Sequence, residues 1–254
     1  MFVACSTDCF ARLPLDRALR LMAELEFSKV DVTISEHGAH LKPSEVVADV
    51  ALAAQRIRIG PMLTPAAFTI EAKTTDADEF RKQLKAICRL ARHTAAPLVC
   101  IPAAASGRGL DTEVKRLKPL VAFVQAEGLI LTVPTRIGTV TETPAAAREL
   151  CERVPELGLT LDPSHYINGP HQGASCDEVF PFVRHVHLRD TGKAPGKFQV
   201  RVGQGEIEYG RIVSQLQRCR YDRLLTVALH DVAEAPFAME TEVRKLKYLL
   251  ESVI

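Results

Sequence analysis

Several features that would place this chain in a special class are missing. No segment approaches the roughly 18 uninterrupted apolar residues of a membrane-spanning helix, and the start of the sequence lacks the basic flank and apolar core of a signal peptide. The 32 basic and 31 acidic side chains balance, so no overall field favours nucleic acid or a membrane surface as a partner. The seven cysteines never form a Cys-x-x-Cys pair, which predicts reduced thiols. We therefore expect a soluble, cytoplasmic protein.

What the sequence does contain is a regular alternation of two kinds of segment. Short runs rich in Val, Ile and Leu alternate with longer segments of helical period, which predicts βα units and a parallel sheet. Eight strands close a barrel, so we predict an α/β fold, a (β/α)8 TIM barrel, as a single domain over residues 1–254. The predicted strands are 2–6, 29–34, 57–63, 97–102, 129–134, 158–162, 184–190 and 223–229, and the predicted helices are Leu15–Leu25, Ser44–Gln55, Asp76–Arg92, Asp111–Glu127, Pro144–Arg153, Tyr209–Cys219 and Phe237–Leu250.

The predicted connections place the functional face. Long loops at 64–75 and 191–207 follow the third and seventh strands, and such loops lie at the C-terminal face of a barrel, where active sites are built. The sixth connection, at 176–182, is short. An open doubly wound sheet is the alternative fold, but it often begins with a glycine-rich turn, and residues 4–8 contain no glycine.

The ends of four consecutive predicted strands carry the residues of greatest chemical interest. Asp162 ends the sixth strand and His187 lies on the seventh, whereas the comparable places on the fifth and eighth hold Pro134 and Ala228. A site for a hard divalent cation needs several carboxylates. The pattern is therefore typical of a metal-dependent scaffold that has lost half of its ligands.

Several motifs resemble those of one known superfamily, over most of the chain and most closely over about 159–227. Leu161-Asp162-Pro163-Ser164-His165 resembles its Leu-Asp-Thr-Gly-His element, and Leu15 to Val32 resembles its first helix and following strand, which ends in a carboxylate, here Asp31. This superfamily, the xylose isomerase-like TIM barrels, includes sugar phosphate isomerases and epimerases, keto-sugar 3-epimerases, hydroxypyruvate isomerase, inosose dehydratase and endonuclease IV. The segments that resemble its C-terminal signature are 186–190, 202–209 and 221–227.

The resemblance implies a site that this chain does not keep intact. In the family's epimerases a divalent cation is bound by a Glu ending strand five, an Asp ending strand six, a His on strand seven and a Glu ending strand eight. The two glutamates also exchange the proton at the carbon being inverted. Here those four places hold Pro134, Asp162, His187 and Ala228, so the usual metal-assisted route is not expected.

Two rearrangements remain open. His230 lies two residues beyond Ala228 and could complete a displaced site with Asp162 and His187, suited to zinc or manganese. Alternatively no metal binds, and Arg136 places a guanidinium where the cation's charge is needed and holds a carboxylate or phosphate. In either case acid-base catalysis would fall to imidazoles, and we assign it to His165 and His187.

Three further residues are candidate substrate contacts. His37 and His40 lie in a glycine-containing loop after the second strand, on the functional face of the predicted barrel. Arg201 precedes the turn at 203–205 and could reach a substrate anion. Ordinary surface histidines and a solvated loop charge are the alternative interpretation.

These observations favour an isomerase or epimerase acting on a sugar, sugar phosphate or sugar acid. The alternative is a non-catalytic carbohydrate-binding or regulatory barrel, which the loss of both glutamates would explain. A second copy of the chain is a further partner to consider. DNA repair of the endonuclease IV kind is disfavoured, because its three-zinc cluster needs carboxylates that are absent here and the composition shows no basic excess. The absence of tryptophan weakens any argument from stacking on a sugar ring.

Overall fold

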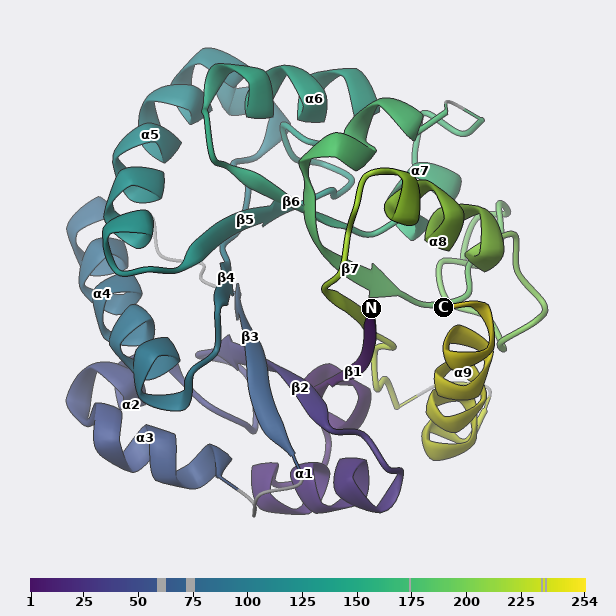
Figure 1. The fold of residues 1–254 in the computed structure, drawn as a ribbon, viewed down its shortest axis with the longest axis horizontal. Coiled ribbons are helices and arrows are strands. Elements are labelled where there is room, and N and C mark those ends of the chain that lie inside the picture. Colours follow the sequence, from purple (N-terminus) through teal and green to yellow (C-terminus); the bar gives the residue numbers. More distant parts are fainter. Residues whose placement is uncertain (59–62, 72–75, 174, 234, 236) are drawn as a thin grey trace.

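The computed structural model describes residues 1–58, 63–71, 76–173, 175–233, 235 and 237–254. Eight parallel strands of this part pair in sequence order, and the last pairs with the first to close a barrel, which confirms the predicted fold class. Figure 1 shows the strands in the middle and the helices around them. The strands are β1 (Phe2–Ser6), β2 (Lys29–Ser35), β3 (Thr64–Glu71), β4 (Leu98–Cys100), β5 (Ile130–Pro134), β6 (Gly158–Leu161), β7 (Val183–Leu188) and β8 (Leu224–Val227).

The outer helices begin and end at local signals in the sequence. At the start of α4, the Asp76 side chain accepts hydrogen bonds from the backbone N–H groups of Asp78 and Glu79, and Ala95 in the left-handed region ends the helix. The apolar faces of the helices pack on the barrel. The helices are α1 (Leu15–Glu24), α2 (Pro43–Ala48), α3 (Val50–Ile57), α4 (Ala77–Thr94), α5 (Leu110–Ala126), α6 (Pro144–Arg153), α7 (Ser164–Ile167), α8 (Tyr209–Arg218) and α9 (Met239–Val253), with short 3-10 helices η1 (Thr7–Phe10), η2 (Ser106–Arg108) and η3 (Asp177–Phe182).

The third strand was predicted in the wrong place. Ile57 ends α3, residues 59–62 lie outside the described part, and β3 begins at Thr64, inside the segment predicted as a loop at 64–75. Residues 72–75 of that segment are also outside the described part. Pro65 conceals the strand pattern, although a proline is tolerated close to the beginning of a strand. The correction matters because it puts Glu71 at a strand end, on the functional face.

The helix predicted over Ser44–Gln55 is two helices, α2 and α3. Asp49 is in extended conformation between them, and its side chain accepts a hydrogen bond from the backbone N–H of Leu52 at 2.9 Å. An aspartate in this position ends one helix and caps the next.

Polar side chains fill part of the barrel interior beneath the C-terminal face. The hydroxyls of Thr132 and Thr160 are 2.8 Å apart, and Thr160 also lies 3.3 Å from the Cys100 sulfur. Asp31 projects from the middle of β2, where the pairing with β3 shifts by one residue after Val30. A buried polar layer whose groups bond to one another holds neighbouring strands in register and forms a rigid floor for the site above it.

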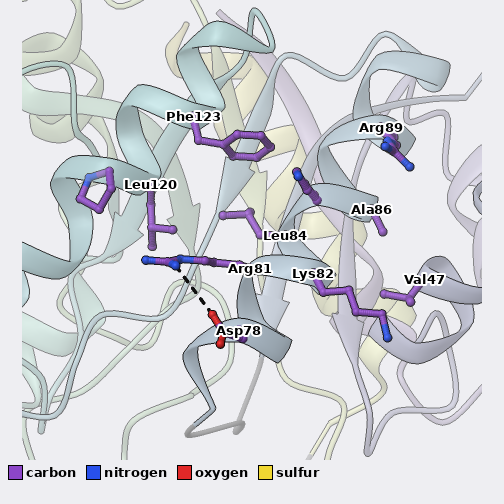
Figure 2. A pocket seen from close by; sticks show the side chains of 11 residues that line it. Val47, Asp78, Arg81, Lys82, Leu84, Ala86, Arg89, Leu120 and Phe123 are labelled. Atoms are coloured by element: carbon purple, nitrogen blue, oxygen red, sulfur yellow. Dashed lines mark ion pairs between the residues drawn. The ribbon is translucent and has the colours of Figure 1, made fainter.

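A separate cavity of about 630 Å³ lies outside the barrel, between α4 and α5. Figure 2 shows Leu84, Leu120 and Phe123 in its wall together with Arg81, whose guanidinium is 3.7 Å from the Asp78 carboxylate. None of the residues predicted as site residues lines it. Within the described residues, no helix combines the length and the apolar character that a membrane crossing requires.

Candidate functional site

A cavity of about 400 Å³ opens at the C-terminal ends of the barrel strands, and we call it the mouth. It brings together five of the residues predicted from the sequence, although they come from four different strand ends. Of the other predicted residues, His37, His40 and Arg201 do not line it. The five that do are Arg136, Asp162, His165, His187 and His230.

Asp162 is bonded to a buried arginine that also lines the mouth. The Nη2 group of Arg189 donates a hydrogen bond to Oδ2 of Asp162, and the two side chains are only 4% and 5% exposed. Ser164 donates to Oδ1 through its backbone N–H at 3.1 Å and through its hydroxyl. Burial by itself would raise the pKa of Asp162, but the Arg189 guanidinium, together with His165, the Ser164 hydrogen bond and His187, outweighs this effect and the pKa falls to about 2. The carboxylate is therefore ionised and already neutralised by an internal cation.

The same guanidinium has hydrogen-bonding capacity left over. Within the described residues, the Nε and Nη1 atoms of Arg189 are buried and have no hydrogen-bond partner. The ring of Phe198 covers the group, with its centroid 5.1 Å from Cζ, and packs 4.7 Å from the ring of His165. Leaving a buried hydrogen-bond donor without an acceptor costs folding free energy, so this arrangement is typical of a site that binds an oxygen atom of a ligand.

His187 is held from below by the buried carboxylate of Asp31. Nε2 of His187 donates to Oδ2 of Asp31 at 2.7 Å, Nε2 of His185 donates to the same oxygen at 2.9 Å, and the Thr69 hydroxyl adds a bond at 3.0 Å. Burial opposes ionisation of Asp31, but the two imidazoles outweigh it and lower its pKa well below the ordinary range. With its proton fixed on Nε2, His187 keeps Nδ1 as the basic nitrogen, and no described residue bonds to Nδ1.

His165 is held in the same tautomer as His187, by a backbone hydrogen bond to its other nitrogen. Its Nδ1 accepts the backbone N–H of Ile137 at 3.3 Å, so the proton of the neutral ring lies on Nε2, 3.7 Å from Oδ2 of Asp162. Burial lowers the pKa of His165 to about 4 despite the nearby Asp162 carboxylate. At neutral pH this side chain is an uncharged hydrogen-bond donor.

Sequence reasoning missed two carboxyl groups of the mouth. Asp8 follows β1 in η1, and Glu71 ends β3. Burial and the neighbouring Glu71 carboxylate raise the pKa of Asp8 to about 6. The position of Asp8 immediately after the first strand was a usable signal, whereas Glu71 was hidden by the misplaced third strand. Asp8 has the pKa expected of a group that exchanges protons near neutral pH.

Arg136 and His230 lie at the rim. Nη1 of Arg136 is 3.5 Å from Oε1 of Glu71, and half of the arginine side chain is exposed. His230 is exposed, and its main chain is fixed by Gln199, whose side chain accepts the His230 N–H at 2.7 Å and donates to its carbonyl at 3.0 Å. The ion pair across the rim neutralises Arg136, so Arg136 and Glu71 together add no net charge to the mouth.

The residues of the mouth do not fit the four-ligand cation site that the resemblance implies. Pro134 and Ala228 line the cavity but offer no side-chain donor atom. In the described part of the chain, the group of carboxylate and imidazole atoms that come within 4.8 Å of one another is Asp31, His185 and His187, and it includes neither Asp162 nor His230. Its members bond to one another: the Nε2 atoms of His187 and His185 both donate to Asp31, at 2.7 and 2.9 Å, and are therefore already used. The geometry therefore does not assemble the displaced site of Asp162, His187 and His230.

Comparison with known proteins agrees with this architecture. The family model for the xylose isomerase-like TIM barrel matches residues 19–249. The chain belongs to this family. A search of curated proteins finds no match.

Solved structures similar to this xylose isomerase-like barrel include metal-bound and epimerase relatives. A xylose isomerase-like TIM barrel protein from Mycobacterium smegmatis in complex with magnesium has 15% identity and a TM-score of 0.76, over 99% of this chain and 97% of that one. D-allulose 3-epimerase from Methylomonas sp. has 14% identity and a TM-score of 0.76, over 100% and 98%. The 3-keto-D-glucoside 4-epimerase of E. coli has 16% identity and a TM-score of 0.72, over 99% of both chains. At these identities the likeness shows the fold.

The three remaining predicted residues do not line the mouth of this xylose isomerase-like barrel. His40 is buried, its Nε2 is 3.0 Å from the carbonyl oxygen of Leu13, and burial lowers its pKa. His37 is exposed in a smaller cavity of about 230 Å³ that also touches Asp8. Arg201 is exposed on the loop after β7. His40 thus joins the loop after β2 to the start of α1, which is a structural contact.

Proposed function

We propose that this barrel is an isomerase or epimerase of a small sugar or sugar acid, and that it transfers protons at the mouth without the family's usual four-ligand cation. One observation carries the proposal: a single cavity of about 400 Å³ is lined by His187, whose Nδ1 is a base, and by Asp8, whose pKa is about 6. Cavities of this size suit small molecules. The His187 assignment agrees with the role inferred from the sequence, whereas Asp8 is new.

The proposed reaction begins at a carbon that carries a hydroxyl and lies next to a carbonyl. Nδ1 of His187 takes the proton from that carbon, and the C–H electron pair forms the C=C bond of an enediolate as the carbonyl π electrons move to oxygen. Asp8, in its protonated form, then returns a proton to carbon. Return to the opposite face of the same carbon inverts it. Return to the neighbouring carbon exchanges the aldose and ketose forms, provided that the hydroxyl proton moves to the former carbonyl oxygen. The cycle closes when His187 releases its proton to solvent and Asp8 takes one up.

The two proton-transferring groups of the proposal come from different strands. His187 lies on β7, whereas Asp8 follows β1, two positions further round the closed strand order. His165 contributes an uncharged Nε2–H, which can donate to a substrate hydroxyl or carbonyl. The Asp31 carboxylate beneath His187 stabilises the imidazolium that forms when Nδ1 takes the proton.

A second candidate function is a non-catalytic carbohydrate-binding barrel. The specific observation in its favour is that Pro134 and Ala228 replace both residues that exchange protons in the family's epimerases, as the resemblance assigns them. The two proposals differ in one measurable property. A binding protein leaves the carbon-bound hydrogens of its ligand in place, whereas an isomerase exchanges them with solvent.

The test is proton NMR of candidate substrates in D₂O with chelator-treated protein. The panel contains ketoses, their phosphate esters, sugar acids and hydroxypyruvate. We expect one compound to lose a carbon-bound proton signal, and we expect the loss to stop in His187→Ala and to slow in His165→Ala. The matched control is His93→Ala, an exposed histidine in the last turn of α4 that lines neither the mouth nor the cavity beside it, which should exchange at the rate of the unaltered protein. Binding of a panel compound without any exchange would favour the binding protein.

A further inference from the structure

We infer that the guanidinium of Arg189 takes the place of the family's divalent cation and donates its unused N–H groups to the carbonyl oxygen of the substrate. The second half of this inference rests on the proposed function, whereas the first half concerns the architecture of the site alone. The sequence interpretation assigned the positive charge that replaces the cation to Arg136, whereas this inference assigns it to Arg189.

The position of the guanidinium supports the first half. Arg189 bonds to Asp162, the residue that the resemblance assigns to the cation, and it follows β7 two residues after His187, the assigned imidazole ligand. Arg136, in contrast, is half exposed at the rim and pairs with Glu71. Of these two cations, Arg189 is therefore the one that contacts an assigned metal ligand.

Charge balance supports the same conclusion. With glutamates at positions 134 and 228, Asp162 would be one of three carboxylates, and one guanidinium would leave two of these charges uncompensated. With Pro134 and Ala228, Asp162 is the one carboxylate left among the assigned ligands, and a single guanidinium neutralises it. The charge of one buried guanidinium thus matches that of the one carboxylate that remains.

The unsatisfied donors support the second half. A guanidinium carries five N–H groups, and the Asp162 contact engages Nη2, while Nε and Nη1 have no partner in the described part of the chain. Arg189 lines the mouth beside His187, so an oxygen of a ligand bound there can accept from these donors. Fixed donors in a buried site stabilise negative charge that develops on oxygen, which is the role a cation plays in enolisation.

Binding of Mn²⁺ alone tests whether Arg189 occupies the cation's place. Electron paramagnetic resonance of free Mn²⁺ should show no stoichiometric binding to the unaltered protein. The variant Pro134→Glu/Ala228→Glu, which keeps the arginine, should also bind none. Pro134→Glu/Arg189→Ala/Ala228→Glu should bind one Mn²⁺, and adding Asp162→Asn to it should abolish the binding.

Two results would overturn the inference. One is a Mn²⁺ ion bound by the unaltered protein and lost in Asp162→Asn. The other is a folded triple variant, judged by circular dichroism, that binds no Mn²⁺. The titration of the unaltered protein requires no substitution, so the inference stays testable even where a variant does not fold.

Kinetics test the contact with the substrate. Arg189→Lys, which keeps a positive charge but loses the planar fork, should lower kcat about 10-fold, and Arg189→Met about 100-fold or more, with KM changed less than kcat. A purely structural arginine would lower thermal stability but leave kcat of the folded fraction unchanged, and that result would contradict the second half. If no compound undergoes exchange at all, the proposed function fails. The Mn²⁺ comparison still tests whether Arg189 occupies the position of the family's cation.

Discussion

The buried pair of Arg189 and Asp162 gives the sharpest prediction about stability. Replacing Arg189 with methionine removes the charge but keeps a side chain of similar length, and it leaves the Asp162 carboxylate buried without its partner. Breaking a buried ion pair in this way costs about 3–5 kcal/mol of unfolding free energy. An independent figure comes from the pKa of Asp162, which falls from 3.8 to about 2 and corresponds to about 2 kcal/mol of net stabilisation of the charged form.

The assay is urea unfolding at pH 7, followed by circular dichroism, for both single variants and the double variant Arg189→Met/Asp162→Asn. We expect the double variant to be more stable than Arg189→Met alone, with a coupling energy of at least about 2 kcal/mol. The folded-state pKa of Asp162 is below its unfolded value, so the pair contributes fully above pH ~4 and loses its contribution as the pH falls towards 2. Additive effects of the two substitutions, or a cost below about 1 kcal/mol for Arg189→Met, would refute the reasoning.

Three further predictions concern the mouth and the loop that covers it. If protonated Asp8 returns the proton, kcat/KM of the exchanging substrate falls as the pH rises through about 6, and Asp8→Asn lacks this pH dependence. A variant whose kcat/KM still falls through pH 6 would exclude Asp8 as the acid. Gly205→Ala should cost about 1–3 kcal/mol in urea unfolding, because its Cβ would lie 2.0 Å from the Asp190 carboxylate, whereas Gly210→Ala, with nothing within 4 Å, should be neutral or stabilising. Phe198→Ala uncovers the Arg189 guanidinium, and hydrogen exchange of its Nε–H by NMR should accelerate; an unchanged rate would mean that Phe198 does not shield it.

The sequence predicts the barrel well because its signal is repeated along the chain. The alternation of apolar runs and amphipathic segments identifies seven of the eight strands in approximately their observed places. The third strand, β3, was misplaced for a local reason. Ile57 continues a helix, and Pro65 near the start of β3 disguises a strand that runs to Glu71. One misplaced strand then concealed one carboxylate of the mouth.

The site is only partly predictable, because strand ends identify which residues face the mouth but not which of them bond to one another. Asp162, His165 and His187 follow from position and resemblance. Arg189 shares the face of His187 in the sequence pattern, yet its contact with Asp162 depends on the backbone path after β7. The pKa of Asp8 depends on burial and on Glu71, which is 63 residues away in the sequence. Long-range electrostatics of this kind have no local sequence signal.

We infer that the mouth transfers protons with its own side chains and the guanidinium of Arg189, without a divalent cation. The most direct test measures the rate of carbon-bound proton exchange, for the compound that responds in the panel, before chelation, after chelation and after Mg²⁺, Mn²⁺ or Zn²⁺ is restored. We expect the same rate in every sample. A rate that disappears on chelation and returns with one equivalent of a divalent ion would contradict this inference.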